Sequence, residues 1–359
     1  MQTDLTDIRL LDLFCGAGGL SQGFHQASSR YRIIAAVEAD RNAAASYAAT
    51  FGEKIVCPTT IQTWLRQGPI PENVDIIIGG PPCQGFSTLG KQDEKDYRNF
   101  LWKQYAETIH ITQPKYFIME NVPAFLKSSQ YNEFSKMTNR RNLLFNYSFE
   151  TKILNSSDYG VPQIRRRAVI IGRRNDCPPV HFPNPTSPNN PPTLQAALQG
   201  VPVHVSTTEL PINRVFHFDG KDLPGPFTPV ELHVNRKYTD LSMKRFASIP
   251  YGGNRFDIPT NLLAKCWRTY TSGAVDVMGR LRWEEPSVTI RTEFFKPEKG
   301  RYLHPTENRA ITLYEAALIQ GFPPDHLFVG SKTAIARQIG NAVPINLAKA
   351  LGNQLAKEF

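Results

Sequence analysis

A short apolar run, residues 74–78, is followed at once by the turn Gly79–Ser87, with the sequence GGPPCQGFS. The run is rich in isoleucine, which is typical of a buried strand. Two consecutive prolines cannot continue a central strand, and they fix the backbone just before Cys83. The chain must therefore turn where this strand ends, and it carries a cysteine on that turn. A free cysteine is usually a small buried core residue. Because α/β folds bind substrates at the carboxyl ends of their strands, we interpret Cys83 instead as a nucleophile.

Apolar runs alternate with helical patterns through the first half of the chain. The patterns predict strands at 8–14, 32–37, 74–78 and 116–119, with helices at 19–27, 42–50 and 100–111. An ordered segment at 312–319 and a final helix at 345–357 follow later. This alternation predicts an α/β fold with a doubly wound, mostly parallel sheet.

The regular alternation stops at residues 177–192, where seven of sixteen residues are proline. Such a stretch can form neither a helix nor a central strand. From there to about residue 286 the sequence is irregular, with short strand-like pieces. We therefore expect a large domain built from residues 1–182 plus 333–359, and a smaller, irregular, β-rich domain with its return segment at 183–332.

The charge of the chain points to a polyanionic partner. It has 41 basic and 32 acidic residues, a net charge of +9, and nucleic acid is the first candidate for such a partner. Five cysteines without a Cys-x-x-Cys pair argue against a disulfide framework and against a metal site. No apolar run reaches the ~20 residues that span a bilayer, and the N-terminus does not have the pattern of a signal peptide. We expect a soluble cytoplasmic protein.

The segment Asp12–Leu20 (DLFCGAGGL) predicts a cofactor site. A strand runs into a glycine loop and then into a helix, and Glu38 ends the next expected strand. A carboxylate at that distance can accept hydrogen bonds from ribose hydroxyls. The spacing is neither Gly-x-Gly-x-x-Gly nor a P-loop. This combination favours a nucleoside cofactor without a pyrophosphate, and S-adenosylmethionine is the most common of these.

The order of motifs resembles that of the C5-cytosine DNA methyltransferases of the bacterial restriction-modification type, over nearly the whole chain. Six segments carry the resemblance: DLFCGAGG at 12–19, GPPCQGFS at 80–87, ENVP at 120–123, QIRRRA at 163–168, TIRT at 289–292 and QIGNAVP at 338–344. The poorly matching stretch, about 180–285, falls where that family carries its target-recognition domain.

The resemblance implies methyl transfer from S-adenosylmethionine to C5 of a cytosine flipped out of a short, specific duplex DNA sequence. Cys83 would add to C6 of the base and form a covalent adduct. Glu120 would hold or protonate N3, and we expect it to be partly buried. Arg165 and Arg167 alternate along an expected strand and so share a face; both would approach the flipped nucleotide, with Arg165 the closer.

The resemblance also implies a set of ten residues around the cofactor: Phe14, Gly16, Ala17, Gly19, Glu38, Ile61, Pro82, Leu101, Asn341 and Ala342. Six residues are candidate DNA contacts: Gln84 and Ser87 in a loop expected to close over the DNA, Arg166 as a backbone contact, and Arg255, Arg268 and Arg280 as contacts to guanine or to phosphate. One departure is Thr60, which stands where many members carry an acidic residue that meets the adenine amino group. A threonine hydroxyl or a backbone carbonyl would then hold the adenine.

The partners implied are double-stranded DNA and a cognate restriction endonuclease acting on the same site, with the enzyme itself a monomer and no membrane involved. Three alternatives remain open at this point. The chain could methylate tRNA cytosine, or it could be a catalytically silent DNA-binding relative. It could also be a cysteine-dependent hydrolase that uses a distant base such as His110, His217 or His304.

Overall fold

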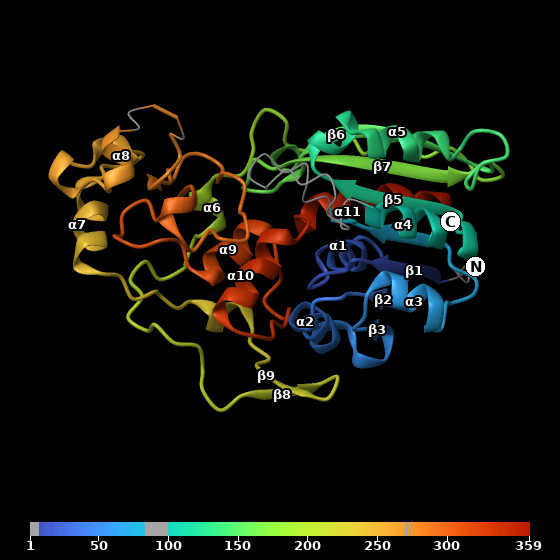
Figure 1. Cartoon of the computed structure of the whole chain (residues 1–359), viewed down its shortest axis with the longest axis horizontal. Helices are drawn as coiled ribbons and strands as arrows, with labels where there is room; N and C mark the ends of the chain where they lie inside the picture. Colours follow the sequence, from blue (N-terminus) through green and yellow to red (C-terminus); the bar gives the residue numbers. More distant parts are fainter. Residues whose placement is uncertain (1–6, 83–99, 270–271, 274) are drawn as a thin grey trace, which may run out of the picture.

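The computed structural model describes residues 7–82, 100–269, 272–273 and 275–359. Its centre is a seven-stranded sheet with the strand order β3-β2-β1-β4-β5-β7-β6 (Figure 1). Strand β7 runs antiparallel to β5 and β6, and the other neighbouring pairs are parallel. The strands are β1 (Ile8–Leu13), β2 (Tyr31–Val37), β3 (Val56–Cys57), β4 (Ile76–Gly79), β5 (Tyr116–Asn121), β6 (Tyr147–Asn155) and β7 (Arg166–Arg174).

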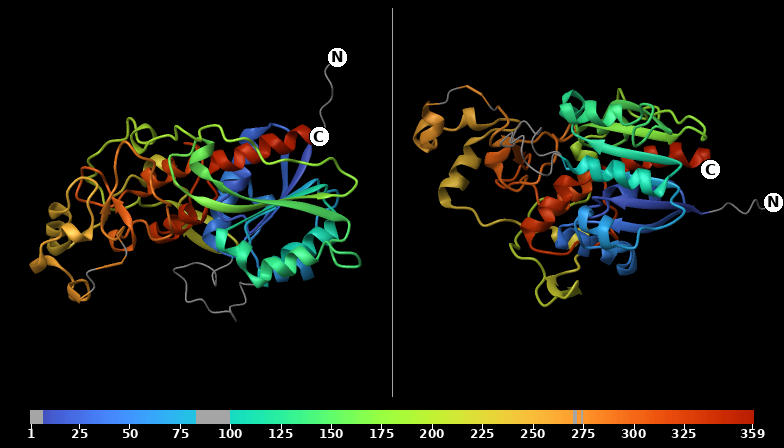
Figure 2. Two further views of the ribbon diagram at one scale, coloured as in Figure 1. Left: turned by 90° about the horizontal axis from the view of Figure 1, so that it is seen from above. Right: turned by 45° about the vertical axis from the view of Figure 1, so that its right-hand side comes forward.

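Helices cover both faces of the sheet because its central strands are apolar on both sides. Along β4, Ile77 faces one hydrophobic cluster while Ile76 and Ile78 face another. Helices α3, α4 and α5 cover the cluster that contains Ile77, and α1 and α11 cover the other cluster. The view from above in Figure 2 shows α11 and α4 on opposite sides of the sheet. These helices are α1 (Gly19–Ala27), α3 (Ile61–Gln67), α4 (Leu101–Thr112), α5 (Ser129–Lys136) and α11 (Ile345–Leu355).

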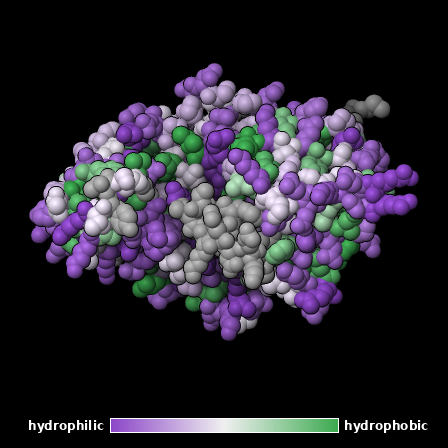
Figure 3. Space-filling view, turned by 45° about the horizontal axis from the view of Figure 1, so that its top comes forward, coloured by the Kyte–Doolittle hydropathy of each residue, from purple (hydrophilic) through white to green (hydrophobic). Residues whose placement is uncertain are grey.

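Residues 183–332 form a second lobe beside the sheet (Figure 1). Its strands are only two to four residues long, so the β-rich character expected from the sequence is weak there. The elements are α6 (Leu194–Ala197), β8 (Val215–Phe218), β9 (Lys221–Pro224), α7 (Asp240–Ser248), α8 (Lys265–Thr269), β10 (Gly279–Arg280), β11 (Arg301–Leu303) and α9 (Leu313–Gln320). In Figure 3 the described surface of both lobes is mostly hydrophilic, with apolar side chains in small separate groups.

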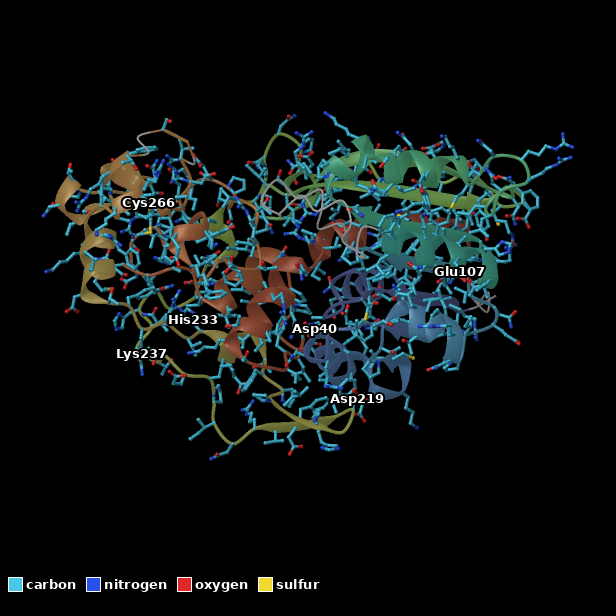
Figure 4. The ribbon with its side chains drawn as sticks, viewed as in Figure 1. Asp40, Glu107, Asp219, His233, Lys237 and Cys266 are labelled. Atoms are coloured by element: carbon cyan, nitrogen blue, oxygen red, sulfur yellow. The ribbon has the colours of Figure 1, made fainter. Side chains whose placement is uncertain are left out.

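Two ion pairs at the start of α2 (Arg41–Phe51) link it to α10 (Lys332–Asn341) and to the second lobe. Asp40, which caps α2 by accepting from the Asn42 and Ala43 amides, pairs with Arg337 at 2.7 Å. Arg337 belongs to α10, which packs on both α2 and α9. Arg41 pairs with Asp219 at the turn between β8 and β9 (2.9 Å), below Asp40 in Figure 4. The expected boundary at residue 333 therefore lies at the start of a helix that contacts both parts.

The structure confirms the doubly wound α/β fold and the expected strands and helices of the first half, to within a few residues at each end. Residues 177–192 contain neither helix nor strand, as their prolines predict. The sequence analysis did not anticipate β3, α3, α5, β6 or α10. Among the described residues, no helix is both long enough and apolar enough to cross a bilayer.

Candidate active site

The site lies where the strand order of the sheet reverses. Strands β1 and β4 are parallel neighbours, and from them the chain proceeds outward in opposite directions, to β2 and β3 on one side and to β5 on the other. In doubly wound sheets, the loops at the carboxyl ends of the strands diverge at this point and leave a crevice. The loops after β1, β2 and β4 carry Phe14, Glu38 and Pro82, and Glu120 lies near the end of β5; all four were selected from the sequence.

The loop after β1 has an unusual backbone. Phe14 has φ +57°, a left-handed conformation that costs a non-glycine residue on the order of 1 kcal/mol. Gly16 has φ +56°, and a Cβ built there would meet no atom of the described residues within 4 Å, so among these residues the loop backbone borders open space. Strain of this kind is retained where a loop must present its backbone to a ligand.

Glu38 holds this loop from the end of β2. Its Oε2 accepts from the Gly16 amide at 2.9 Å, and its Oε1 accepts from the Asp40 amide at 2.7 Å. Burial raises the pKa of Glu38 above its ordinary value, and these amide hydrogen bonds oppose the rise. Each carboxylate oxygen has a second lone pair that can accept from a ribose hydroxyl.

The remaining cofactor residues come from several parts of the chain. Phe14, Ile61 and Leu101 belong to one apolar cluster, which could form a wall against a flat ring. A Cβ on Gly19 would lie 3.1 Å from the Ala342 Cβ and 2.8 Å from the Val343 carbonyl, so only glycine permits this contact of α1 with the segment after α10. Ala17 is buried, Pro82 is half-buried, and Asn341 is exposed at the end of α10.

The residues present fit a nucleoside cofactor. The open space at Gly16 gives room for the cofactor. The fixed carboxylate of Glu38 can accept from a ribose hydroxyl, and the apolar wall can contact the ring. The Thr60 hydroxyl takes part in the start of α3, and its oxygen keeps one lone pair that an adenine amino group could use. Thr60 Oγ1 caps α3 by accepting from the Thr63 amide and donates to the Thr63 hydroxyl.

Asp12 is a buried acid that the sequence analysis did not single out. Its Oδ2 accepts from the Ser21 hydroxyl at 2.7 Å, and that hydroxyl also bonds to Tyr47. Burial, with a smaller contribution from the charge of Glu38, raises the pKa of Asp12 to about 8. The position of Asp12 inside the 12–19 motif is the feature of the sequence that could have identified it. The network ties β1, α1 and α2 together beneath the loop.

Glu120 and Arg167 form the best-defined part of the site. Arg167 Nε lies 2.8 Å from Glu120 Oε1, and the two side chains are 15% and 12% exposed. The partial burial expected of Glu120 is thus present. A Cβ built on Gly80 would lie 3.0 Å from Glu120 Oε2, so this carboxylate borders the turn that leads to Cys83.

Asn121 fixes that turn from the neighbouring strand. Its Nδ2 donates to the Pro81 carbonyl at 3.0 Å, and its Oδ1 accepts from the Val122 amide at 2.8 Å. The motif Glu120–Pro123 therefore places a carboxylate and holds the proline turn at the same time. The sequence analysis assigned the first role only.

Arg165 has different surroundings from Arg167. It lies just before β7, is 3% exposed, and donates to the Ile290 carbonyl (2.7 Å) and the Gly340 carbonyl (3.0 Å). Burial lowers its pKa well below the ordinary value. Its guanidinium joins three distant segments, whereas Arg167 is the arginine that is paired with Glu120.

The candidate DNA contacts fall into three groups. Arg166 and Arg268 are exposed. Arg255 is 6% exposed, donates to the Ser272 carbonyl and lies over the Phe256 ring. Arg280 is 4% exposed and donates to four carbonyls and to Asn308 Oδ1, so this arrangement leaves it no donor for a base. Cys83, Gln84 and Ser87 lie outside the described residues.

Comparison with known proteins identifies relatives along the whole chain. A family model described as C-5 cytosine-specific DNA methylase matches residues 8–357. Type II methyltransferase M1.HphI of Haemophilus parahaemolyticus is 32% identical over 354 residues, covering 97% of this chain and 86% of that protein. Type II methyltransferase M.DdeI of Desulfomicrobium norvegicum is 32% identical over 386 residues, covering 98% and 89%.

Solved structures share the fold. A putative DNA modification methyltransferase encoded within an Escherichia coli prophage superposes with a TM-score of 0.73 at 24% identity, covering 98% of this chain and 99% of that one. The Dnmt2 methyltransferase of S. pombe gives a TM-score of 0.58 at 16% identity, covering 98% of both chains. At these identities the superpositions establish the architecture alone.

Proposed function

The chain belongs to the C-5 cytosine-specific DNA methylases and is a DNA (cytosine-5) methyltransferase, and from this premise we propose that it modifies a cytosine flipped out of a short, specific duplex sequence through a covalent Cys83–C6 adduct. The methyl donor in this proposal is S-adenosylmethionine. The observation that carries the proposal is the Glu120–Arg167 pair beside the turn leading to Cys83.

The chemistry assigns a task to each of these side chains. Cytosine C5 is a poor nucleophile, and addition of a Cys83 thiolate to C6 gives an enamine that is reactive at C5. The addition places charge on the base, which Glu120 relieves by holding N3 or, when itself protonated, by giving its proton to N3. Arg167 holds the Glu120 carboxylate in place and is the closer of the two arginines to the base, in contrast to the order expected from the sequence. S-adenosylmethionine, when bound, supplies an electrophilic methyl group.

The proposed cofactor site is the crevice lined by Phe14, Gly16, Glu38 and Leu101, with Ala342 behind Gly19. Three observations support it: the carboxylate anchored to the Gly16 amide, the open space at Gly16, and the apolar cluster that contains Phe14 and Leu101. For the adenine amino group we propose a backbone carbonyl or the remaining lone pair of Thr60 Oγ1, whose proton is already donated to the Thr63 hydroxyl.

We further propose that residues 183–332 read the target sequence, with Arg166 and Arg268 as contacts to the DNA backbone. The hydrophilic surface and the net charge of +9 suit such a partner. The relatives are named Type II methyltransferases, so a cognate restriction endonuclease acting on the same site is the proposed companion. The enzyme is proposed to act as a monomer in the cytoplasm.

Base-resolution 5-methylcytosine sequencing tests the substrate. A random-sequence duplex library is incubated with the protein and S-adenosylmethionine, and methylation at one short motif is expected. A library that stays unmethylated, in the presence of folded protein that binds the cofactor, would refute a DNA substrate. The same incubation with tRNA then tests the alternative substrate.

A mechanism-based trap tests the covalent step. Duplex DNA carrying 5-fluorocytosine at the target blocks the final loss of the C5 substituent, so the wild-type enzyme should remain attached through denaturing electrophoresis. Cys83→Ser should form no such complex. Cys266→Ser, at an exposed position in the second lobe, is the matched control and should trap like wild type (Figure 4). Trapping by Cys83→Ser would eliminate Cys83 as the nucleophile.

A further inference from the structure

Two buried glutamines from distant parts of the chain are hydrogen-bonded to each other. Gln163, which stands before β7, and Gln320, the last residue of α9, are both completely shielded from solvent. Gln163 Nε2 donates to Gln320 Oε1 at 2.9 Å. Burial of an amide side chain is costly unless its polar atoms are paired, so the contribution of these residues lies in their hydrogen bonds. We call the two side chains the glutamine bridge.

Backbone groups at its two ends fix the direction of the glutamine bridge. The Ile290 amide donates to Gln163 Oε1 at 2.9 Å, which leaves Gln163 Nε2 to face Gln320. Gln320 Nε2 in turn donates to the Ile339 carbonyl at 2.6 Å and lies 3.4 Å from the Ala342 carbonyl. Because a backbone N–H stands at one end and backbone carbonyls stand at the other, reversing either amide would place like groups face to face. The bridge therefore has one arrangement.

One end of the glutamine bridge holds the segment behind the cofactor loop. Ala342 follows α10, and a Cβ on Gly19 would lie 3.1 Å from the Ala342 Cβ, so the start of α1 packs against this segment. Because Gln320 donates to a carbonyl at the end of α10, it limits how far Ala342 can move away from the cofactor loop.

The other end holds the part of the chain that leads to Arg167. The Gln163 carbonyl accepts from the Ser156 hydroxyl at 2.7 Å, and the amide of the next residue, Ile164, donates to the Ser287 carbonyl at 2.8 Å. Only three residues separate Gln163 from Arg167, whose guanidinium is paired with the carboxylate proposed to hold N3. A shift of the bridge would therefore be transmitted to that pair.

Arg165 provides a second link between the same segments. It donates to the Ile290 carbonyl at 2.7 Å and to the Gly340 carbonyl at 3.0 Å. Both polar backbone groups of Ile290 are thus held, the amide by Gln163 and the carbonyl by Arg165. At the end of α10, the carbonyls that accept from Arg165 and from Gln320 belong to adjacent residues. Two links at different points resist rotation as well as translation of one segment against the other.

We propose that Gln163 and Gln320 are positioning residues, which hold the cofactor crevice and the Glu120–Arg167 pair at the separation that methyl transfer needs. This inference rests on the proposed function. Neither glutamine contacts the cofactor or the base; they act through Ala342 and Arg167. Reacting atoms must lie about 3–3.5 Å apart, and a misplacement of about 1 Å can lower the rate about 10²-fold. Loss of the bridge should therefore affect the rate of transfer more than the binding of either ligand.

The test uses the full-length protein and three bridge variants. Gln163→Met, Gln320→Met and the double variant keep the length of the side chains and remove the amides. Tyr31→Phe is the matched control, because it removes a different buried hydrogen bond, from the Tyr31 hydroxyl to the Gly352 carbonyl at 2.7 Å. Tyr31 begins β2, at the end of the sheet opposite the site.

Three quantities are measured for each variant. Single-turnover methylation, with duplex DNA carrying the target motif and with both ligands saturating, gives the rate of transfer. Calorimetric titration with S-adenosylmethionine, without DNA, gives the dissociation constant of the cofactor. Thermal unfolding reports stability and shows that each variant is folded. If a Met variant does not fold, Gln320→Asn, whose amide is too short to span the same gap, replaces it with the same expectation.

Each single Met variant is expected to transfer the methyl group about 10- to 100-fold more slowly than wild type, with a cofactor dissociation constant within about threefold of wild type. The double variant should be no slower than the slower single variant, because residues that act as one unit are not additive. Tyr31→Phe should lower the unfolding temperature and keep the transfer rate within about twofold of wild type.

Three results would overturn the inference. Met variants that transfer the methyl group at the wild-type rate would show that the bridge does not position the two half-sites. Equal losses of rate and of cofactor affinity would show that it only shapes the cofactor crevice. Multiplied losses in the double variant would show that the glutamines act separately. Wild-type protein that methylates no duplex DNA would overturn the proposed function instead, so the two failures are distinguishable.

Discussion

Arg167 and Glu120 meet across adjacent antiparallel strands, with 2.8 Å between Arg167 Nε and Glu120 Oε1. The pair occupies the end of the sheet at which β4 leads into the proline turn. Because both side chains are mostly shielded from solvent, their attraction is less screened than that of a surface pair. The pair therefore fixes the direction of the Glu120 carboxylate before any substrate is present.

Replacement of Glu120 by glutamine should lower kcat by about 10²- to 10⁴-fold, because the amide cannot transfer a proton to N3. Affinity for duplex DNA should change little, since the shape of the side chain is kept. Single-turnover methylation and equilibrium DNA binding, measured side by side, check this. A glutamine variant with near-normal turnover would show that Glu120 is not the proton donor.

Arg166→Ala and Arg167→Ala make a matched pair, because the two arginines are sequence neighbours with different surroundings. Arg166 is exposed, so its loss should weaken DNA binding and lower the slope of log affinity against log salt by about one. Loss of Arg167 should chiefly reduce kcat, since Glu120 is left without its partner. Equal effects of the two variants on kcat and on the salt slope would contradict the assignment.

The arginine run shows what the sequence could predict and where it reached its limit. It placed Arg165 and Arg167 on one face, with Arg165 the closer to the flipped nucleotide, whereas in the structure Arg167 is the arginine that pairs with Glu120. The sequence could not reveal this difference, because Arg165 donates to the carbonyls of Ile290 and Gly340, which lie more than a hundred residues away in the chain. Arg280 illustrates the same limit, since its five acceptors come from segments whose positions only the folded chain defines.

Local sequence patterns were sufficient for elements whose conformation depends mainly on their own residues. The isoleucine run at 76–78 and its glycine–proline ending predicted β4 and the turn after it. The sequence analysis predicted no helix over α10, which ends in Gly340 and Asn341. Gly340 is required there for packing: a Cβ would lie 2.5 Å from the Arg291 carbonyl carbon.

Arg280→Ala should destabilise the second lobe, whereas Arg268→Ala should not. Removal of Arg280 leaves several buried carbonyls without donors, at a cost of about 3 kcal/mol or more. Arg268 is exposed, so its replacement should change the free energy of unfolding by less than about 0.5 kcal/mol while weakening DNA binding. Urea unfolding and DNA titration of both variants check this. If the Arg280→Ala protein is as stable as wild type but binds a different target sequence, Arg280 is a base contact.

Asp12→Asn should remove a pH dependence from the stability of the protein. Burial raises the pKa of the Asp12 carboxyl from 3.8 to about 8, so the folded state keeps a proton that the unfolded chain loses near pH 4. The contribution of this group to stability is therefore complete below pH 4 and is lost as pH rises toward 8, at about 1.4 kcal/mol per pH unit. Asparagine resembles the neutral acid at every pH and should abolish that slope.

Urea unfolding at pH 5 and pH 8 provides the measurement for Asp12. Between these values, wild type should lose up to about 4 kcal/mol more than the Asp12→Asn variant. Glu107→Gln, which replaces an exposed carboxyl on α4, is the control and should keep the wild-type slope (Figure 4). If the free energies of unfolding of Asp12→Asn and wild type change equally with pH, Asp12 is ionised in the folded protein. Its buried charge must then be balanced by groups of the loop after β1, which Glu38 also contacts. Loss of the pH dependence in the asparagine variant would instead establish that Asp12 is neutral in the folded protein.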